Sequence, residues 1–330
     1  MVAYTGIQGQ NILIVSSDPA NPTEGQIWYN STSNLLKGYA NVVINAWASG
    51  GNVNNARYYS GAAGTQTATL IFGGDPGAVA TTESYNGTSW SPVSSLNTGR
   101  SGSAGSGTQT AALGFGGGTP PGTQTESWNG SSWTAVNSMN TWHNVTASAN
   151  AGTQTATLCF GGVNPSPGDN IAATESWNGS SWTSVNSMNT ARRELGGFGI
   201  QTAALAFGGE SPGNAFPTAT ELWNGTSWTT VNSFNTGRMA NTGAGLQSGG
   251  LQFGGRLPPS YAVTAATELW NGTSWTSNPN SLATAKFTTG SGTQTAALAS
   301  SGAAAPGTTP TTGTEEWTGT ALATRTITTS

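Results

Sequence analysis

Short apolar runs that end in two glycines recur along this chain at nearly constant intervals. They are TLIFGG, ALGFGG, TLCFGG, ALAFGG and LQFGG, starting at Thr69, Ala112, Thr157, Ala204 and Leu251. A G-x-Q anchor accompanies each run and occurs once more near the C-terminus, at Gly64, Gly107, Gly152, Gly199, Gly245 and Gly292, so the period is 43 to 47 residues. A period of this length, with strand-sized pieces, predicts a propeller or an array.

Each unit contains four strand signals, which we call a, b, c and d. A segment of small residues is followed by the apolar run, a loop of variable length, an alternating run such as TESW, and a second short run that begins with Trp. Asn-Gly separates the last two, and this dipeptide is the strongest local signal for a β-hairpin because both turn positions favour positive φ. The sequons that begin at Asn86, Asn129, Asn178, Asn224 and Asn271 are therefore interpreted as turns.

This order resembles the kelch repeat, and Thr174 to Arg192 is similar to the outer hairpin of a kelch unit and its exit. The resemblance covers about residues 47 to 317, whereas the Trp-Asp and Gly-His signatures of WD propellers are missing. It implies an all-β fold, a six-bladed kelch-like β-propeller with four antiparallel strands in each blade.

Ring closure needs a sixth d strand, because only five follow a c strand with the full pattern, at Trp90, Trp133, Trp182, Trp228 and Trp275. Trp47 lies ten residues before Arg57, the spacing also found from Trp90 to Arg100, so we expect the strand around Trp47 to complete the last blade. The alternative is that Thr320 to Ser330 form that strand.

Residues 1–41 lie outside the repeat and are expected to form an attachment segment, with residues 42–330 as the propeller. Two short strands, Gln26 to Tyr29 and Leu35 to Tyr39, are predicted on either side of a polar turn. A lone hairpin is marginally stable in water, so this segment should dock on something else.

The repeated tryptophans and charges are interpreted as structural, because no catalytic site needs six copies. The aromatic residues should pack between blades. In-register acids and cations suggest ion pairs, which fix register more reliably than they add stability. The acids are Glu83, Glu126, Glu175, Glu221, Glu268 and Glu315; the cations are Arg57, Arg100, Arg192, Arg238 and Lys286, with His143 in the third unit.

The amino-acid composition of the chain argues against some classes of binding partner. Charged residues form 7% of the chain and the net charge is −4, which argues against a nucleic-acid or anionic-membrane surface. The start MVAYTGIQGQ has no basic region and no apolar core of a signal peptide. Cys159, the one cysteine, lies in an apolar run and is expected to be a core residue.

The loops between strands b and c differ between units, whereas the a–b and c–d turns barely change. Loops on a rigid scaffold are where recognition usually occurs, so we expect a binding face there. The candidate residues are Asp75, Asp169, Glu210, Phe216, Arg256 and Tyr261, together with Trp142 from a d–a loop.

Enzymatic interpretations find little support. Copper-radical oxidases of the kelch class need several histidines and a Cys–Tyr pair, but His143 is the only histidine. The Asp of sialidase hairpins is replaced by Tyr85 or Trp128, and no Ser-His-Asp set can be argued. We therefore expect a chain that is not an enzyme and binds no cofactor or metal.

Low charge, abundant Thr, Ser, Asn and Gly, and near-identical units together resemble the virion proteins of tailed bacteriophages. The segment NPTEGQIWYNSTSNLLKGY, from Asn21 to Tyr39, resembles short N-terminal modules of phage tail fibres. The resemblance implies a homo-oligomeric virion protein that attaches to other virion proteins through residues 1–41 and binds host surface polysaccharide through the b–c loops. The alternatives are a capsid or tail decoration protein that contacts only virion proteins, and a bacterial adhesin or intracellular interaction propeller.

Overall fold

The computed structural model describes residues 12–118, 122–164, 169–304 and 309–327. All of its regular elements in these ranges are β-strands, and none of the described residues forms a helix long and apolar enough to cross a bilayer. The chain divides into two compact units, residues 45–318 and residues 1–44 with 319–330. The two units are described separately.

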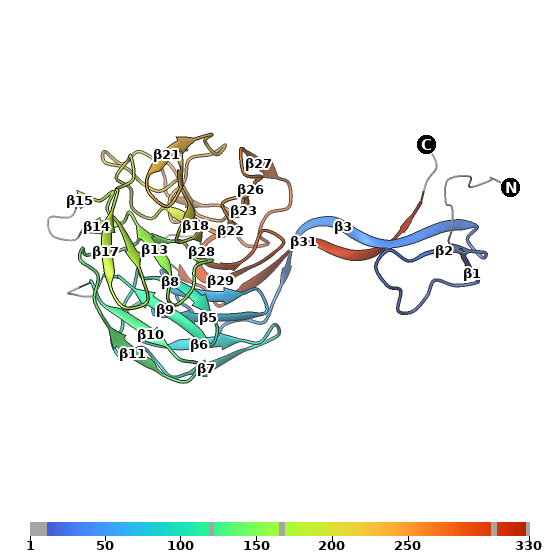
Figure 1. Ribbon diagram of the computed structural model, residues 1–330, viewed down its shortest axis with the longest axis horizontal. Coiled ribbons are helices and arrows are strands. Elements are labelled where there is room, and N and C mark those ends of the chain that lie inside the picture. The colour runs from blue at the N-terminus through green and yellow to red at the C-terminus, as the bar shows by residue number, and fades with distance from the viewer. Residues whose placement is uncertain (1–11, 119–121, 165–168, 305–308, 328–330) are drawn as a thin grey trace. The chain divides into compact units, whose positions relative to one another are not determined.

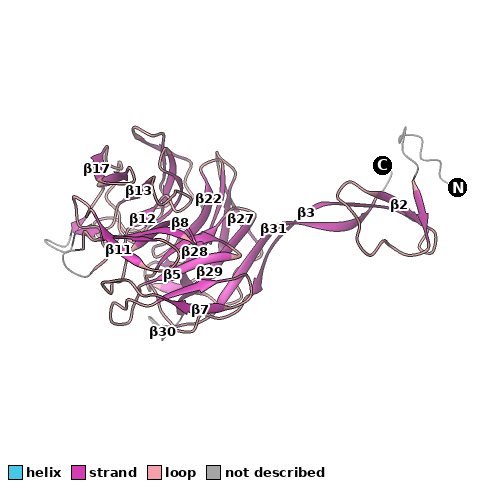
Figure 2. Ribbon diagram, turned by 60° about the horizontal axis from the view of Figure 1, so that its bottom comes forward, coloured by secondary structure: helices cyan, strands magenta, loops and turns pink. Residues whose placement is uncertain are grey.

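The unit of residues 45–318 contains five antiparallel four-stranded sheets, which we number I to V, and part of a seven-stranded sheet, which we number VI (Figures 1 and 2). Sheet I contains β4 (Gly61–Thr65), β5 (Ala68–Phe72), β6 (Thr82–Tyr85) and β7 (Trp90–Val93). Sheet II contains β8 (Ala104–Thr108), β9 (Ala111–Phe115), β10 (Thr125–Trp128) and β11 (Trp133–Val136). Sheet III contains β12 (Ala147–Ser148), β13 (Thr157–Phe160), β16 (Thr174–Trp177) and β17 (Trp182–Val185).

Sheet IV contains β18 (Gly196–Ile200), β19 (Ala203–Phe207), β20 (Thr220–Trp223) and β21 (Trp228–Val231). Sheet V contains β22 (Thr242–Leu246), β23 (Gly249–Phe253), β26 (Thr267–Trp270) and β27 (Trp275–Asn278). Two small hairpins lie in the b–c loops, β14 (Val163–Asn164) with β15 (Asp169–Asn170), and β24 (Arg256–Leu257) with β25 (Ala262–Val263). The predicted order of strands within a unit is therefore confirmed in these five sheets.

Sheet VI combines the two ends of the repeat region. It contains β28 (Lys286–Gly292), β29 (Ala296–Ala304), β31 (Thr314–Thr326) and β3 (Leu35–Ser49), in that spatial order, and β30 (Thr309–Pro310) pairs with β29. The strand that carries Trp47 thus lies beside the strand that carries Trp317. Of the alternative candidate, Thr320 to Ser330, residues 320–326 instead continue β31, and residues 328–330 lie outside the described residues.

The first strand of each sheet lies nearest a common axis and contacts the first strands of its neighbours, from β4 through β8, β12, β18 and β22 to β28, which contacts β4. Crowding at this axis explains the small residues there. A Cβ on Gly105 would lie 2.5 Å from the carbonyl oxygen of Ala62 in the neighbouring sheet. A larger residue would therefore push two sheets apart.

One hydrogen bond from a Trp to a Thr recurs between neighbouring sheets. Trp133 Nε1 of sheet II donates to Thr82 Oγ1 of sheet I at 3.1 Å, and the Trp133 ring packs on Phe72 with centroids 4.8 Å apart. The same bond joins Trp182 to Thr125, Trp228 to Thr174, Trp275 to Thr220, Trp47 to Thr267 and Trp90 to Thr314. The Trp of the d strand thus fastens each sheet to the preceding one.

A second repeated bond comes from the Gln of the G-x-Q anchor. Gln247 Nε2 of sheet V donates to the carbonyl oxygen of Trp223 in sheet IV at 2.8 Å. Equivalent bonds run from Gln66 to Trp317, Gln109 to Tyr85, Gln154 to Trp128, Gln201 to Trp177 and Gln294 to Trp270. The anchor is therefore constant because its side chain links neighbouring sheets near the a–b turns.

The repeated acid and the repeated cation form a buried ion pair in each sheet, as the register predicts. Arg192 Nη2 lies 2.7 Å from Glu221 Oε1, and both side chains are at most 1% exposed. The equivalent pairs are Arg57–Glu83, Arg100–Glu126, His143–Glu175, Arg238–Glu268 and Lys286–Glu315.

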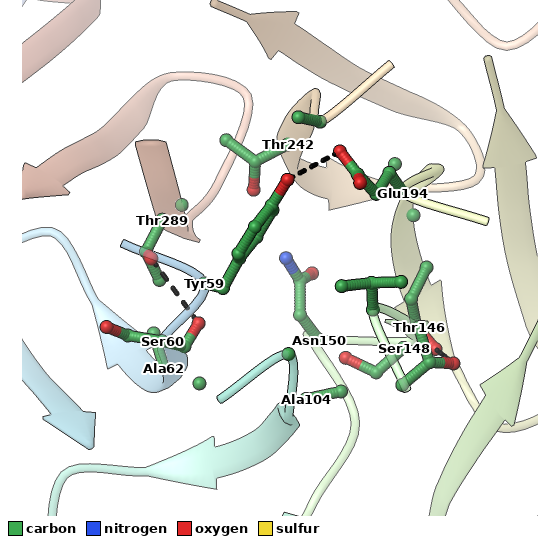
Figure 3. Close-up of a pocket in the computed structure, with 18 of the residues that line it drawn as sticks. Tyr59, Ser60, Ala62, Ala104, Thr146, Ser148, Asn150, Glu194, Thr242 and Thr289 are labelled. Atoms are coloured by element: carbon green, nitrogen blue, oxygen red, sulfur yellow. Dashed lines mark hydrogen bonds between the residues drawn. The ribbon is translucent and has the colours of Figure 1, made fainter. Parts of the chain in front are cut away.

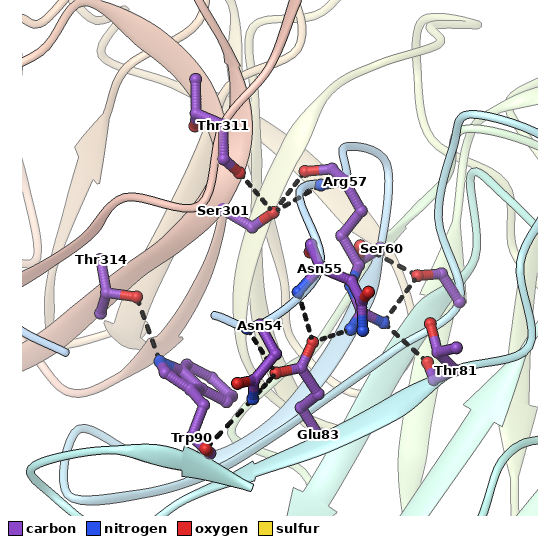
Figure 4. A network of polar contacts seen from close by, with 11 residues as sticks. Asn54, Asn55, Arg57, Ser60, Thr81, Glu83, Trp90, Ser301, Thr311 and Thr314 are labelled. Atoms are coloured by element: carbon purple, nitrogen blue, oxygen red, sulfur yellow. Dashed lines mark hydrogen bonds and ion pairs between the residues drawn. The ribbon is translucent and has the colours of Figure 1, made fainter. Parts of the chain in front are cut away.

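In sheets I to V, an Asn three residues before the cation also donates to the repeated glutamate. Figure 4 shows this arrangement in sheet I. Asn54 donates to Glu83 Oε2 from its backbone N–H and its side-chain amide, both at 2.7 Å, and its amide also reaches the Trp90 carbonyl at 3.1 Å. Asn97, Asn140, Asn189 and Asn235 occupy this position in sheets II to V, whereas sheet VI has Ala283. A buried carboxylate that accepts several hydrogen bonds is stabilised in its charged form.

The other unit contains β1 (Leu13–Val15), which is parallel to β2 (Ile27–Asn30), and the first part of β3, which is antiparallel to β2. The predicted hairpin is present. Asp18 holds it, because its carboxylate accepts hydrogen bonds from Trp28 Nε1 at 3.0 Å and Asn30 Nδ2 at 2.8 Å and lies 2.6 Å from Lys37 Nζ. The C-terminal end also belongs here, since Ile327 N–H donates to the Leu36 carbonyl at 2.9 Å.

Removal of one partner from a buried ion pair should be strongly destabilising. Arg100→Met leaves Glu126 charged and unpaired in the interior, so we expect a loss of about 3–5 kcal/mol in the free energy of unfolding, measured by chemical denaturation. The double variant Arg100→Met/Glu126→Gln should recover part of that loss. Lys37→Met, which breaks a partly exposed pair, is the control and should change stability far less, because water and salt screen exposed charges. Equal effects of R100M and K37M would contradict this account.

His143 makes the ion pair of sheet III pH-dependent. Burial opposes its charge, but Cys159, Glu175 and the Gly161 carbonyl together raise its pKa from 6.5 to about 10. A raised pKa in the folded state stabilises the protein fully below pH 6.5, and this contribution, on the order of a few kcal/mol, disappears as the pH rises through about 10. In the His143→Arg variant the cation stays charged, so its stability relative to the native chain should increase between those pH values. A constant difference across this range would show that His143 is neutral in the fold.

Candidate functional site

A polar chamber lies on the axis, at the end of the inner strands where the d–a loops enter (Figure 3). Residues from all six sheets line it, and its volume is about 120 Å³. Most wall positions are Gly, Ala or Ser, because the strands crowd the axis. The other lining residues include Tyr59, Asn150, Glu194, Asn241 and Phe287, which are large or polar. A volume of this size holds several water molecules or one small polar group.

Tyr59 and Glu194 meet across the chamber. Tyr59 Oη of the segment entering sheet I donates a hydrogen bond of 2.7 Å to Glu194 Oε2 of the segment entering sheet IV. Arg256, at the start of a b–c loop in sheet V, approaches the same hydroxyl with Nη1 at 3.4 Å and stacks over the Phe287 ring with Cζ 4.1 Å from the centroid. Three units that are distant in sequence therefore contribute to one cluster.

The backbone that carries this cluster has positive φ at the second position after the cation. φ is 54° at Tyr59, 48° at Glu194 and 50° at Ala240. The conformation directs backbone groups to the neighbouring sheet, because Glu194 N–H donates to the Val145 carbonyl at 2.9 Å and Ala240 N–H donates to the Glu194 carbonyl at 2.8 Å. Tyr59 and Glu194 thus share a conformation unfavourable for residues with a Cβ, which the repeat also gives at Gly102, Val145 and Ala240.

Burial sets the electrostatics of the cluster. It raises the pKa of Glu194 above its usual value, while the hydrogen bond from Tyr59 and the charge of Arg256 oppose that shift. Burial and the carboxylate of Glu194 also raise the pKa of the Tyr59 phenol well above 10. Tyr59 is therefore a hydrogen-bond donor at neutral pH and not a base.

Asn150 crosses the opposite end of the chamber. His143 and Gly152 are nine residues apart, whereas Arg57 and Gly64 are seven apart, so sheet III contains two extra residues here. Asn150 lies in this insertion, and its Nδ2 donates to the Gly243 carbonyl of sheet V at 2.8 Å. Its Oδ1, the side-chain amide of Asn241 and Ser103 Oγ have no hydrogen-bond partner among the described residues. These buried groups require water or a ligand.

A second cavity of about 520 Å³ lies beside the chamber, between the β14–β15 hairpin and the loop from Glu210 to Asn214. We call it the groove. Arg193, which precedes Glu194, lies in it and pairs with Glu210 at 2.9 Å from Nη2 to Oε1. Asn170 Nδ2 donates to the Glu210 carbonyl at 2.9 Å and joins the hairpin to this loop. The groove therefore contains two of the residues predicted from the sequence, Asp169 and Glu210.

The other predicted binding residues are distributed among separate positions. Phe216 and Tyr261 contact each other, with ring centroids 5.5 Å apart, and Tyr261 is 41% exposed. Asp75 caps its own loop by accepting the Ala78 N–H at 3.1 Å. Trp142 Nε1 donates to the Gly117 carbonyl at 2.6 Å and its ring covers Gly122, where a Cβ would lie 1.7 Å from Nε1. Trp142 is thus used for packing, while Arg256 joins the chamber.

Sequence reasoning missed Tyr59, Asn150, Arg193 and Glu194. The two-residue insertion that contains Asn150 was a signal, but the positions of Tyr59, Arg193 and Glu194 differ in every unit and so gave none. Nothing local, however, shows that positions 59 and 194 face each other across an axis.

The chemistry available here is hydrogen bonding to a polar ligand. Among the described residues, no three of the His, Cys, Asp and Glu side chains gather as they would around a metal ion. The two cavities contain carboxylates, amides, hydroxyls and guanidinium groups, which suit recognition of hydroxyl-rich molecules.

No protein-family model and no curated protein sequence matches the chain. Among solved structures, that of YjhT is similar in fold, with a TM-score of 0.64 and 12% sequence identity, over 83% of this chain and 96% of that chain. With the all-β sheets around one axis, this likeness shows that the fold is a β-propeller. At this identity the likeness concerns the fold alone, and it does not support the expectation of a chain without enzymatic activity.

Loss of the Tyr59 hydroxyl should change the titration of Glu194. The hydrogen bond from Tyr59 lowers the pKa of Glu194, so Tyr59→Phe should raise that pKa further. Carbon-13 NMR of labelled glutamate carboxyl groups across the acidic and neutral range would follow it. Tyr58→Phe, one residue earlier, is the matched control and should leave the Glu194 titration in place. An unchanged Glu194 titration in Y59F would mean that the two residues are not bonded in solution.

Proposed function

We propose that sheets I to VI are the six blades of a closed kelch-like propeller, with the strand around Trp47 as the outer strand of the last blade. The Trp-to-Thr and Gln-to-carbonyl bonds support this proposal, because each occurs at every junction, including that between sheets VI and I. At that junction Trp90 Nε1 donates to Thr314 Oγ1 at 3.1 Å, and Gln66 Nε2 donates to the Trp317 carbonyl at 2.6 Å. Bonds of this kind leave no sheet without a neighbour on both sides.

We further propose that the protein is a virion protein of a tailed bacteriophage that binds a host surface receptor, a glycan, through the b–c loop face. The observation that carries this proposal is the contrast between the two faces of residues 45–318. The a–b turns repeat the same Gln bonds in every sheet, whereas the chamber, the groove and the Phe216–Tyr261 pair all lie on the b–c and d–a side. A surface specialised at one end of a repetitive scaffold suits recognition.

The N-terminal unit is the proposed attachment to other virion proteins. Its first strand, β1, lies at the edge of its sheet and, among the described strands, pairs only with β2. Leu13 and Ile14 on this strand are 49% and 71% exposed. An exposed apolar edge strand is a template for pairing with another chain, so its presence here suits assembly into a particle.

The second candidate is a capsid or tail decoration protein that contacts only virion proteins. The exposed strand β1 supports this candidate as well as the first, because it suits attachment to a particle whether or not the b–c loop face binds a ligand. A decoration protein would have no host ligand on its b–c loop face, whereas a receptor-binding protein would have one. This difference separates the two candidates.

Competition for adsorption tests the proposed function. The full-length protein, labelled with a fluorophore, should bind some isolates in a panel of bacteria and should slow adsorption of a phage that carries this gene to the same isolates. Antibodies against the protein should label intact particles by electron microscopy. Labelled particles without competition would indicate a decoration protein, and unlabelled particles would exclude a place in the virion.

A further inference from the structure

The groove differs from the equivalent position of every other sheet. Where a b–c loop starts, its first residue forms a backbone bridge with the residue after the repeated cation, and four such bridges are described: Tyr58–Asp75, Asn144–Val163, Arg193–Glu210 and Met239–Arg256. Of these four, only Arg193–Glu210 brings two opposite side-chain charges together. Among the four sheets with such a bridge, the oppositely charged pair is thus specific to sheet IV.

The groove is also held in shape by bonds that do not involve a ligand. Arg193 and Glu210 exchange backbone hydrogen bonds of 3.0 and 2.8 Å, and Asn170 ties the opposite wall to the Glu210 carbonyl. Glu210 is 2% exposed, whereas the Arg193 side chain is 35% exposed. A site whose walls are fixed before binding loses less entropy when a ligand arrives.

The ion pair at the base of the groove retains unused hydrogen-bonding capacity. Glu210 Oε2 and Arg193 Nε have no hydrogen-bond partner among the described residues. One is an acceptor and the other a donor. A water molecule or a sugar hydroxyl group can donate to the first and accept from the second.

The charge of the groove excludes the usual acidic sugars. Arg193 and Glu210 compensate each other, and exposed Asp169 has no ion-pair partner in the part of the chain that the structure describes, so the groove carries about one negative charge. A carboxylated, sulfated or phosphorylated sugar would meet that charge with no free cation on the described walls. Hydroxyl groups, by contrast, can donate to the Asp169 carboxylate.

An aromatic surface lies at the end of the same loop. Phe216 follows the groove residues Ser211 to Asn214, and its ring packs at 62° against partly exposed Tyr261 of the next sheet. Aromatic rings offer an apolar face and Tyr adds a polar tip, a combination suited to the C–H face of a pyranose ring.

We propose that the groove binds an uncharged pyranose unit of a glycan, with Asp169, Arg193 and Glu210 contacting its hydroxyl groups and Tyr261 covering an adjoining sugar. This inference rests on the proposed receptor-binding function and names the class of sugar that the loop face takes.

Binding to immobilised oligosaccharides tests it. The probes are neutral glucans, mannans, galactans and N-acetylhexosamine oligomers, set against sialylated, uronate-containing and sulfated ones. The full-length protein should bind at least one neutral probe, and Asp169→Ala and Arg193→Met should each weaken that binding about tenfold or more. Glu24→Ala, which removes an exposed acid of the N-terminal unit, is the control and should bind as the native chain does.

Circular dichroism of each variant checks that the fold is retained, and exposed Asp169 can be replaced without disturbing the core. Preference for acidic probes, or equal binding by D169A and E24A, would overturn the groove assignment. Binding to bacteria without binding to any carbohydrate would also overturn it, yet would leave the receptor-binding function standing. Failure to bind bacteria at all would remove the proposed function as well.

Discussion

Each sheet of this protein has two faces that only its neighbours can cover, and the rest of the structure follows from that constraint. The Trp of the d strand combines a large apolar ring with one donor, so it buries area against the neighbouring Phe and also satisfies a buried Thr hydroxyl. The Gln of the anchor adds a bond near the turns. Because the same two residues serve every junction, they are constant between units, and the differences between units are concentrated in the b–c loops.

A second constraint comes from the buried carboxylates. A chain with 7% charged residues places the six repeated glutamates in its interior, and each needs a cation and several N–H donors to stay charged there. The bonds to Asn54 and its counterparts meet that need while fixing the loop that leads from one sheet into the next. These networks therefore define where each inner strand begins, and the position two residues beyond the cation is where Tyr59 and Glu194 enter the chamber.

Repetition made much of this predictable. The Gly-Gly pairs, Asn-Gly turns and in-register charges located the strands and the ion pairs, because each repeat shows the same local pattern again. Asn54 was not identified, although Asn recurs three residues before most of the cations. The union of residues 319–327 with the N-terminal unit was also missed, because the expected boundary was drawn where the repeat begins and ends. The Tyr59–Glu194 contact joins positions 135 residues apart and has no signature in a linear pattern.

Departures from the repeat identify the specialised part of the molecule better than residue type alone. Trp142 was predicted from the sequence to be a binding residue, but its ring packs over Gly122. Arg193, by contrast, seemed an ordinary neighbour of the repeated Arg192. Arg193 nevertheless changes a backbone bridge shared with other sheets into a buried ion pair with unsatisfied hydrogen-bonding atoms. Like Asn150 Oδ1 and the side-chain amide of Asn241, these atoms have no hydrogen-bond partner among the described residues, so water or a ligand must satisfy them.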